Sequence, residues 1–203
     1  MEKQSFFKLL IFFILLCVSC MHNTAFAKVY IDIDAPGFQQ FPIAICDFQN
    51  KKGGAAPSSD FNTALADSIR HYLDLSGIFN VLDKKSFLEG LEPGTPETIR
   101  FSDWSVIGAD FLLRGDIITS QNDVIVESRL YDVTRGQLLF NKKYSGKTGD
   151  LPAMARAIAA DILLALTGDE GDFNTKMAFV IKKNGRSDIY TMDYDTSNLK
   201  NLT

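Results

Sequence analysis

Two β-rich runs near the middle of the chain most restrict what it can fold into. Residues 124–133 and 137–144 are rich in Val, Ile, Leu, Phe and Tyr, and only Thr134-Arg135-Gly136 separates them. Such a short turn between two β-rich runs predicts an antiparallel hairpin. A third apolar run at residues 111–118 precedes it directly, so we expect the hairpin to pair beside this strand.

Helical patterns stand between the remaining β-rich runs, which lie at residues 41–48 and 78–82. Apolar side chains recur at helical spacing from Phe61 to Leu73, and Asn62, Asp67, Arg70 and Asp74 fill the opposite, polar face. We predict short helices at residues 84–89 and ending at 104–109, and a buried helix at 151–166. The order predicts an α/β fold: a mixed sheet of about five strands with packed helices, over residues 28–168.

The character of the sequence changes after Gly168. Residues 177–181 and 188–193 flank Asn184-Gly185, which is a strong hairpin signal. We therefore expect residues 169–203 to form a linker and a separate hairpin. Because an isolated hairpin is marginally stable in water, it either docks on the α/β domain or belongs to a longer chain.

The first 27 residues have the three parts of a secretory signal peptide. Lys3 and Lys8 precede an apolar run at residues 9–18, and Ala25-Phe26-Ala27 supplies the A-x-A pattern. The run is shorter than the roughly 20 residues that cross a bilayer as a helix. We expect export and cleavage between Ala27 and Lys28; acylation at Cys20 is an alternative, since Val18-Ser19-Cys20 loosely resembles a lipoprotein processing site.

After this cleavage the mature chain contains one cysteine, Cys46, and one histidine, His71. Cys46 lies in the apolar stretch 43–46, which favours a small buried residue over a nucleophile paired with His71. His71 follows Asp67 by four residues, so a surface ion pair is expected. Trp104 is expected to anchor a helix to the sheet.

Two further patterns resemble functional motifs without completing them. Gly146-Lys147-Thr148 resembles the end of a phosphate-binding loop, but Asn141 stands where that motif needs a glycine. The pairs Asp32/Asp34 and Asp193/Asp195 lack the six to eight oxygen ligands that calcium takes. We expect no catalytic residue, no metal and no cofactor.

Several motifs, in their order and spacing, resemble the TolB family. They are the apolar strand ending in Cys46-Asp47-Phe48, the helix ending in Ser76-Gly77-Ile78-Phe79, the turn at 104–108, the helix exit Leu164-Ala165-Leu166-Thr167-Gly168 and the segment 176–203. The resemblance implies an α/β domain similar to the anticodon-binding domain of some tRNA synthetases, followed by a six-bladed β-propeller. Residues 169–203 would then be a linker and part of the first blade.

The resemblance also implies a periplasmic protein–protein interaction component of the Tol-Pal envelope system, which supports outer-membrane integrity and division and is not an enzyme. Its mature N-terminal arm would bind TolA, and here the arm is Lys28, Val29, Tyr30, Ile31, Asp32, Ile33 and Asp34. The alternating pattern of this arm is compatible with strand addition to a partner's sheet, or with a fixed edge strand of its own domain. Pal binding is a weaker expectation, because in the family the propeller supplies that contact.

Two alternatives stay open. Propellers of this kind also precede hydrolase domains, so the chain would be the exported N-terminal part of a peptidase. RNA binding by the anticodon-like domain is opposed by the net charge of −4 and by the scarcity of Lys/Arg clusters. We expect neither a nucleic acid nor a small-molecule substrate.

Overall fold

The computed structural model describes residues 39–51, 59–87, 99–120, 123–183 and 185–203. The elements, in chain order, are β1 (Phe41–Ile45), β2 (Gln49–Asn50), α2 (Ser59–Leu75), β3 (Phe79–Val81), the 3-10 helix η1 (Lys84–Ser86), α3 (Phe101–Val106), β4 (Phe111–Ser120), β5 (Asp123–Asp132), β6 (Gln137–Lys147), the 3-10 helix η3 (Thr148–Asp150), α4 (Leu151–Thr167), β7 (Lys176–Lys183), β8 (Arg186–Asp193) and β9 (Lys200–Asn201).

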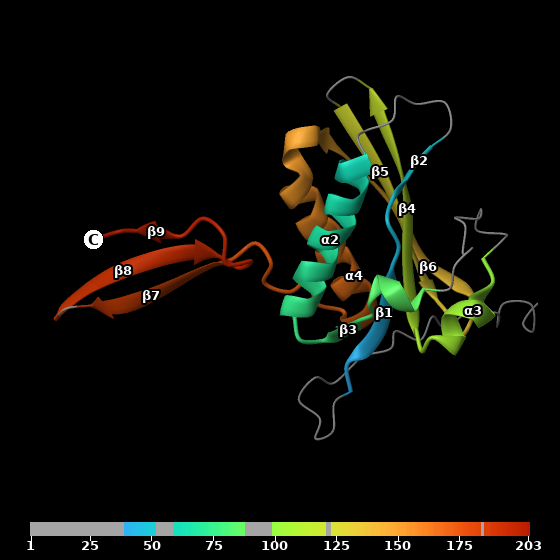
Figure 1. Ribbon diagram of the computed structural model, residues 1–203, viewed down its shortest axis with the longest axis horizontal. Helices are drawn as coiled ribbons and strands as arrows, with labels where there is room; N and C mark the ends of the chain where they lie inside the picture. Colours follow the sequence, from blue (N-terminus) through green and yellow to red (C-terminus); the bar gives the residue numbers. More distant parts are fainter. Residues whose placement is uncertain (1–38, 52–58, 88–98, 121–122, 184) are drawn as a thin grey trace, which may run out of the picture.

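A mixed six-stranded sheet forms the centre of the α/β body (Figure 1). Its strand order is β3-β1-β4-β5-β6, and β2 pairs with β4. β1 runs parallel to both β3 and β4, whereas β5 runs antiparallel to both β4 and β6. The predicted α/β class and the predicted central hairpin are confirmed. The additional strand is β2, which was not among the strands expected from the sequence.

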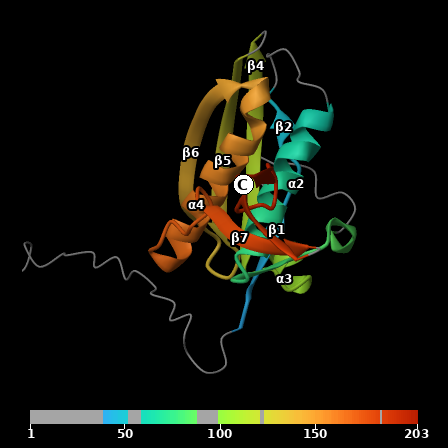
Figure 2. The same ribbon diagram turned by 90° about the vertical axis from the view of Figure 1, so that its left-hand side faces the viewer.

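Helices α2 and α4 lie side by side over one face of the sheet, as both views show (Figures 1 and 2). Alternation along the strands supplies the core beneath them: Ile43, Ile45, Leu113 and Ile117 face the helices and are almost completely buried. Helix α4 contributes Met154, Ile158, Ile162 and Leu166, the face predicted from the sequence. The helix ends at Gly168, whose φ of 84° is the left-handed conformation that glycine adopts without a steric penalty.

A smaller apolar cluster lies on the opposite face of the sheet, next to α3. Ala44 and Leu112 point to this face because they alternate with the residues that face α2 and α4. Trp104 is 2% exposed, packs in this cluster, and meets Phe87 edge to face with ring centroids 5.1 Å apart. Trp104 therefore joins α3 to the sheet, as predicted.

The C-terminal strands form a second sheet, with the order β7-β8-β9 (Figure 1). β7 and β8 make the predicted hairpin, with Lys183 opposite Arg186, and Gly185 in the turn has a φ of 80°. The sheet extends away from the body on the side of α2 and α4 (Figures 1 and 2). The body and this sheet are thus two structural units joined by residues 168–175.

Candidate functional site

The TolA-binding residues predicted from the sequence, Lys28, Val29, Tyr30, Ile31, Asp32, Ile33 and Asp34, lie outside the described residues, and so do the cleavage site Ala27/Lys28 and Cys20. Those assignments stay predictions. Three other places among the described residues bear on function: a polar network at the end of β1, a contact between the two units, and the exposed surface of the C-terminal sheet.

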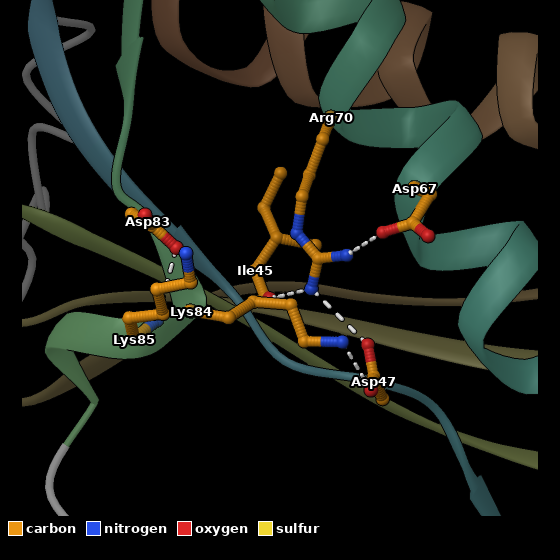
Figure 3. A network of polar contacts seen from close by, with 7 residues as sticks. All are labelled: Ile45, Asp47, Asp67, Arg70, Asp83, Lys84 and Lys85. Atoms are coloured by element: carbon orange, nitrogen blue, oxygen red, sulfur yellow. Dashed lines mark hydrogen bonds and ion pairs between the residues drawn. The ribbon is translucent and has the colours of Figure 1, made fainter.

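The first is a polar network at the carboxyl end of β1 (Figure 3). The guanidinium of Arg70, from α2, donates to the Ile45 carbonyl and pairs with Asp67 one turn earlier. It also lies 3.2 Å from Asp47 Oδ1, and Lys84 Nζ, from η1, lies 2.5 Å from Asp47 Oδ2. The network thereby joins α2, the end of β1 and the segment after β3.

This network corrects the prediction for α2. Arg70 and Asn62 were both assigned to a solvent-facing side, but the Arg70 side chain is only 13% exposed, and Asn62 is buried with its amide 3.0 Å from Asn50 Oδ1. The expected His71–Asp67 pair is also wrong, because Asp67 pairs with Arg70 and the His71 ring lies beside Tyr72. Both polar side chains reach across to segments that follow β1.

The charges in this network largely balance. Burial by itself raises the pKa of Asp47, but hydrogen bonds from Lys84 and Arg70, together with their charges, outweigh burial and hold the pKa below its ordinary value. Asp47 is therefore ionised at neutral pH and serves as the common acceptor for both cations. Such an arrangement fixes neighbouring segments and offers no proton for transfer.

Cys46 lies next to this network but is not activated by it. Burial is the largest influence on the thiol and raises its pKa to about 11, against the opposing charges of Arg114 and Arg70. A thiol with such a pKa is protonated near neutrality and is a poor nucleophile. Among the described residues no hydrogen bond joins Cys46 to His71, which is exposed on α2.

The other patterns that fall within the described residues also have structural partners. The backbone N–H of Lys147 donates to Asp150 Oδ2 at 2.9 Å, so a carboxylate of the chain itself engages this backbone donor. Asp193 pairs with Lys176 and accepts from Asn198, whereas Asp195 accepts from Tyr72. No group of three metal-ligating side chains occurs within the described ranges.

The second meeting place joins the two units. The Tyr72 hydroxyl, from α2, donates to Asp195 Oδ2 at 2.6 Å. Phe173, in the connecting segment, packs edge to face against Tyr72 and against Tyr194, with ring centroids 5.8 and 5.5 Å away. The Tyr194 hydroxyl donates to the carbonyl of Leu75 at 3.3 Å.

The third place is the exposed surface of the C-terminal sheet. Val180, Ile189 and Leu202 are opposite one another in β7, β8 and the end of the chain, and they are 64%, 43% and 53% exposed. Ile181, on the other face of β7, is also exposed. Apolar side chains exposed on both faces of a sheet are typical of a surface that contacts further protein. Within the described part of the chain, no helix is long and apolar enough to span a bilayer.

Comparisons with known proteins agree on one family. Residues 29–139 match the family model of the TolB amino-terminal domain. The Tol-Pal system protein TolB of Syntrophus aciditrophicus is 32% identical over 174 residues, which are 85% of this chain and 38% of that protein. The same protein of Syntrophotalea carbinolica is 32% identical over 192 residues, covering 94% of this chain and 44% of the relative.

A solved structure gives the same result for the fold. The crystal structure of TolB from Acinetobacter baumannii matches with a TM-score of 0.63 and 25% sequence identity, over 81% of this chain and 39% of that one. The chain thus spans about two fifths of the length of the relatives that it matches.

Proposed function

Because the chain belongs to the TolB family, whose amino-terminal domain it contains, we propose that it is a periplasmic interaction component of the Tol-Pal envelope system and that residues 28–34 bind TolA. In this proposal residues 1–27 are a cleaved signal peptide, residues 28–168 form the interaction domain, and residues 169–203 form a linker and the start of a propeller. The protein acts by binding, in support of outer-membrane integrity and cell division.

The observation that carries the proposal is the match of residues 29–139 to the amino-terminal domain of this family. The surroundings of the described polar groups are consistent with it. Cys46 is a thiol with a raised pKa, whereas Asp47, paired with two cations, and Asp195, which accepts from Tyr72, hold segments of the chain together.

The arm itself is proposed to bind as an added strand. In the sequence Val29-Tyr30-Ile31-Asp32-Ile33-Asp34 apolar side chains alternate with Tyr or Asp, so an extended conformation places Val29, Ile31 and Ile33 on one face. Strand addition takes affinity from backbone hydrogen bonds and specificity from alternate side chains. The order of the residues therefore matters as much as their composition.

Titration calorimetry with the periplasmic part of TolA from the same organism tests this proposal. We expect deletion of residues 28–34 to abolish binding and to leave the melting temperature nearly unchanged. The matched control is an arm with the same seven residues in an order that breaks the alternation, and it should also fail to bind. Full TolA affinity in the deletion variant would refute the assignment of the arm.

Mass spectrometry of the exported protein tests the processing step independently. A mature N-terminus at Lys28 is expected. A lipid-modified terminus at Cys20 would show instead that the chain is anchored, and residues 28–34 would then lie within a tether.

A further inference from the structure

We propose that Tyr72, Phe173, Tyr194 and Asp195 form a releasable clasp, which sets the orientation of the β7-β8-β9 sheet on the α/β body, and that residues 168–171 are its hinge. The proposal concerns the joint between the two units and does not depend on TolA binding. Three observations carry it: the narrowness of the contact, the geometry of the connecting segment, and the way the contact is built.

The contact between the units is narrow. Among the described residues, no strand of the C-terminal sheet packs broadly against a helix or strand of the body; β7 is largely exposed, and β8 is partly exposed with no fully buried residue. The units meet through Phe173 and the turn after β8, which reach the C-terminal part of α2 (Figure 1). Two units joined by a small contact are expected to move relative to each other unless specific interactions prevent it.

The connecting segment contains two glycines in the left-handed region. Gly168 has a φ of 84° and Gly171 has a φ of 68°. A Cβ added to Gly171 would lie 2.4 Å from Leu163 Cδ2, so the backbone approaches α4 closely at this position. Glycine permits both the close approach and a change of backbone angles, which is what a hinge needs.

The clasp is built from two kinds of interaction. Phe173 is 2% exposed, packs in the main apolar cluster of the body, and contacts the rings of both Tyr72 and Tyr194 edge to face. At the same point the Tyr72 hydroxyl of the body donates a hydrogen bond to the charged Asp195 carboxylate, which follows β8. Charge-assisted hydrogen bonds are stronger than neutral ones, so this bond is the main polar tie of the closed orientation.

The turn that presents Asp195 is itself held in shape. Thr196 and Asn198 both have positive φ values, 67° and 55°, and the Ser197 N–H donates to Asp195 Oδ1 at 3.0 Å. The carboxylate is therefore oriented before it meets Tyr72, and it keeps a partner after release. Opening the clasp would expose Tyr72 and Phe173 without unfolding either unit.

Limited digestion with chymotrypsin tests this inference, with cleavage after Phe173 located by mass spectrometry. The test variant is Tyr72→Phe, which removes the hydroxyl and keeps the ring in the aromatic contact. Loss of one hydrogen bond to a charged group shifts an equilibrium about ten- to hundredfold, so the rate of this cut should rise by that factor. The matched control is Tyr190→Phe in β8, whose hydroxyl contacts Asn201 within the same sheet, and its rate should not change.

Amide hydrogen exchange of the same variants separates release from unfolding. If the clasp is releasable, amides of α2, α4, β7 and β8 in Tyr72→Phe keep their protection while cleavage after Phe173 accelerates. An unchanged cleavage rate would overturn the proposal, because the bond would then contribute nothing to closure. A parallel loss of protection in either unit would also overturn it, because the contact would then be part of the fold.

Discussion

Replacing Arg70 by Met is predicted to be among the most destabilising polar substitutions in the chain. The Arg70 side chain is 13% exposed, and its guanidinium contacts the Ile45 carbonyl, Asp47 and Asp67. Met preserves much of the side-chain stem and removes every donor. The Ile45 carbonyl then loses this donor, and Asp47 keeps only Lys84 of its two cationic partners.

The magnitude follows from the exposure of the two carboxylates. Hydrogen bonds to charged groups contribute about 1.5–3 kcal/mol each, and the Asp47 side chain is 36% exposed, so we expect Arg70→Met to lower the free energy of unfolding by about 2–3 kcal/mol. The Asp67 side chain is 59% exposed, and exposed ion pairs contribute about 0–1 kcal/mol. Asp67→Asn is therefore the matched control, because it removes a partner of the same guanidinium at the surface.

Urea unfolding followed by the fluorescence of Trp104, the single tryptophan of the chain, measures both variants. With a slope of about 2 kcal/mol per molar urea, Arg70→Met should lower the unfolding midpoint by roughly 1 M or more, whereas Asp67→Asn should shift it by less than about 0.5 M. Equal losses in the two variants would refute the reasoning, since the surface pair would then account for the stabilisation. A neutral Arg70→Met would refute it as well.

Three further predictions concern other positions. Gly115→Ala should lower the free energy of unfolding by about 1–3 kcal/mol in thermal melts, because the new Cβ would lie 2.3 Å from Phe48 Cε1 and 2.5 Å from the Glu127 carbonyl oxygen. The control Gly149→Ala, with open space around its Cβ, should be neutral or slightly stabilising. Similar effects of the two substitutions would contradict this packing. Burial opposes ionisation of Asp195, but hydrogen bonds from Ser197 and Tyr72 lower its pKa to about 2. The stabilisation by the ionised carboxylate is therefore complete above the ordinary carboxyl pKa of about 4 and is lost as the pH falls toward 2. In acid titrations Asp195→Asn should lose less stability over this range than the parent chain, and an identical acid profile would contradict the assignment. Iodoacetamide at about pH 8 should modify Cys46 far more slowly in the folded mature chain than in urea, because burial raises the thiol pKa to about 11, and equal rates would contradict that environment.

Periodicity in the sequence predicted the elements that bury a continuous apolar face. Helix α4 and the hairpins β5-β6 and β7-β8 were predicted because their apolar spacing and their glycine-containing turns are local signals. β2 could not be predicted in this way, since two polar residues that pair with β4 carry no periodic pattern. The α/β class therefore followed from the sequence, and the additional strand did not.

The polar contacts were predicted less well, for a physical reason. A helical pattern assigns every charged residue to the solvent side. The Arg70 side chain, however, is long enough to reach the end of β1, where the Ile45 carbonyl and Asp47 accept hydrogen bonds from its guanidinium. Tyr72 and Asp195 are 123 positions apart in the chain, and no local signal relates them. Tyr72 lies within the apolar pattern predicted from Phe61 to Leu73, and its partner became apparent only from the position of the C-terminal sheet.

Helix α2 therefore has two structural tasks that lie two residues apart. Arg70 ties it to the end of β1 and, through Asp47, to η1 (Figure 3). Tyr72 ties it to the C-terminal sheet through Asp195. The Arg70 contacts join segments of the body and include a backbone carbonyl, so breaking them lowers the stability of the body itself. The Tyr72 contact crosses a narrow joint, and its proposed opening exposes Tyr72 and Phe173 while both units stay folded. The same helix is thus fixed on one side and adjustable on the other, which allows the C-terminal sheet to change orientation while the sheet that carries β1 stays intact.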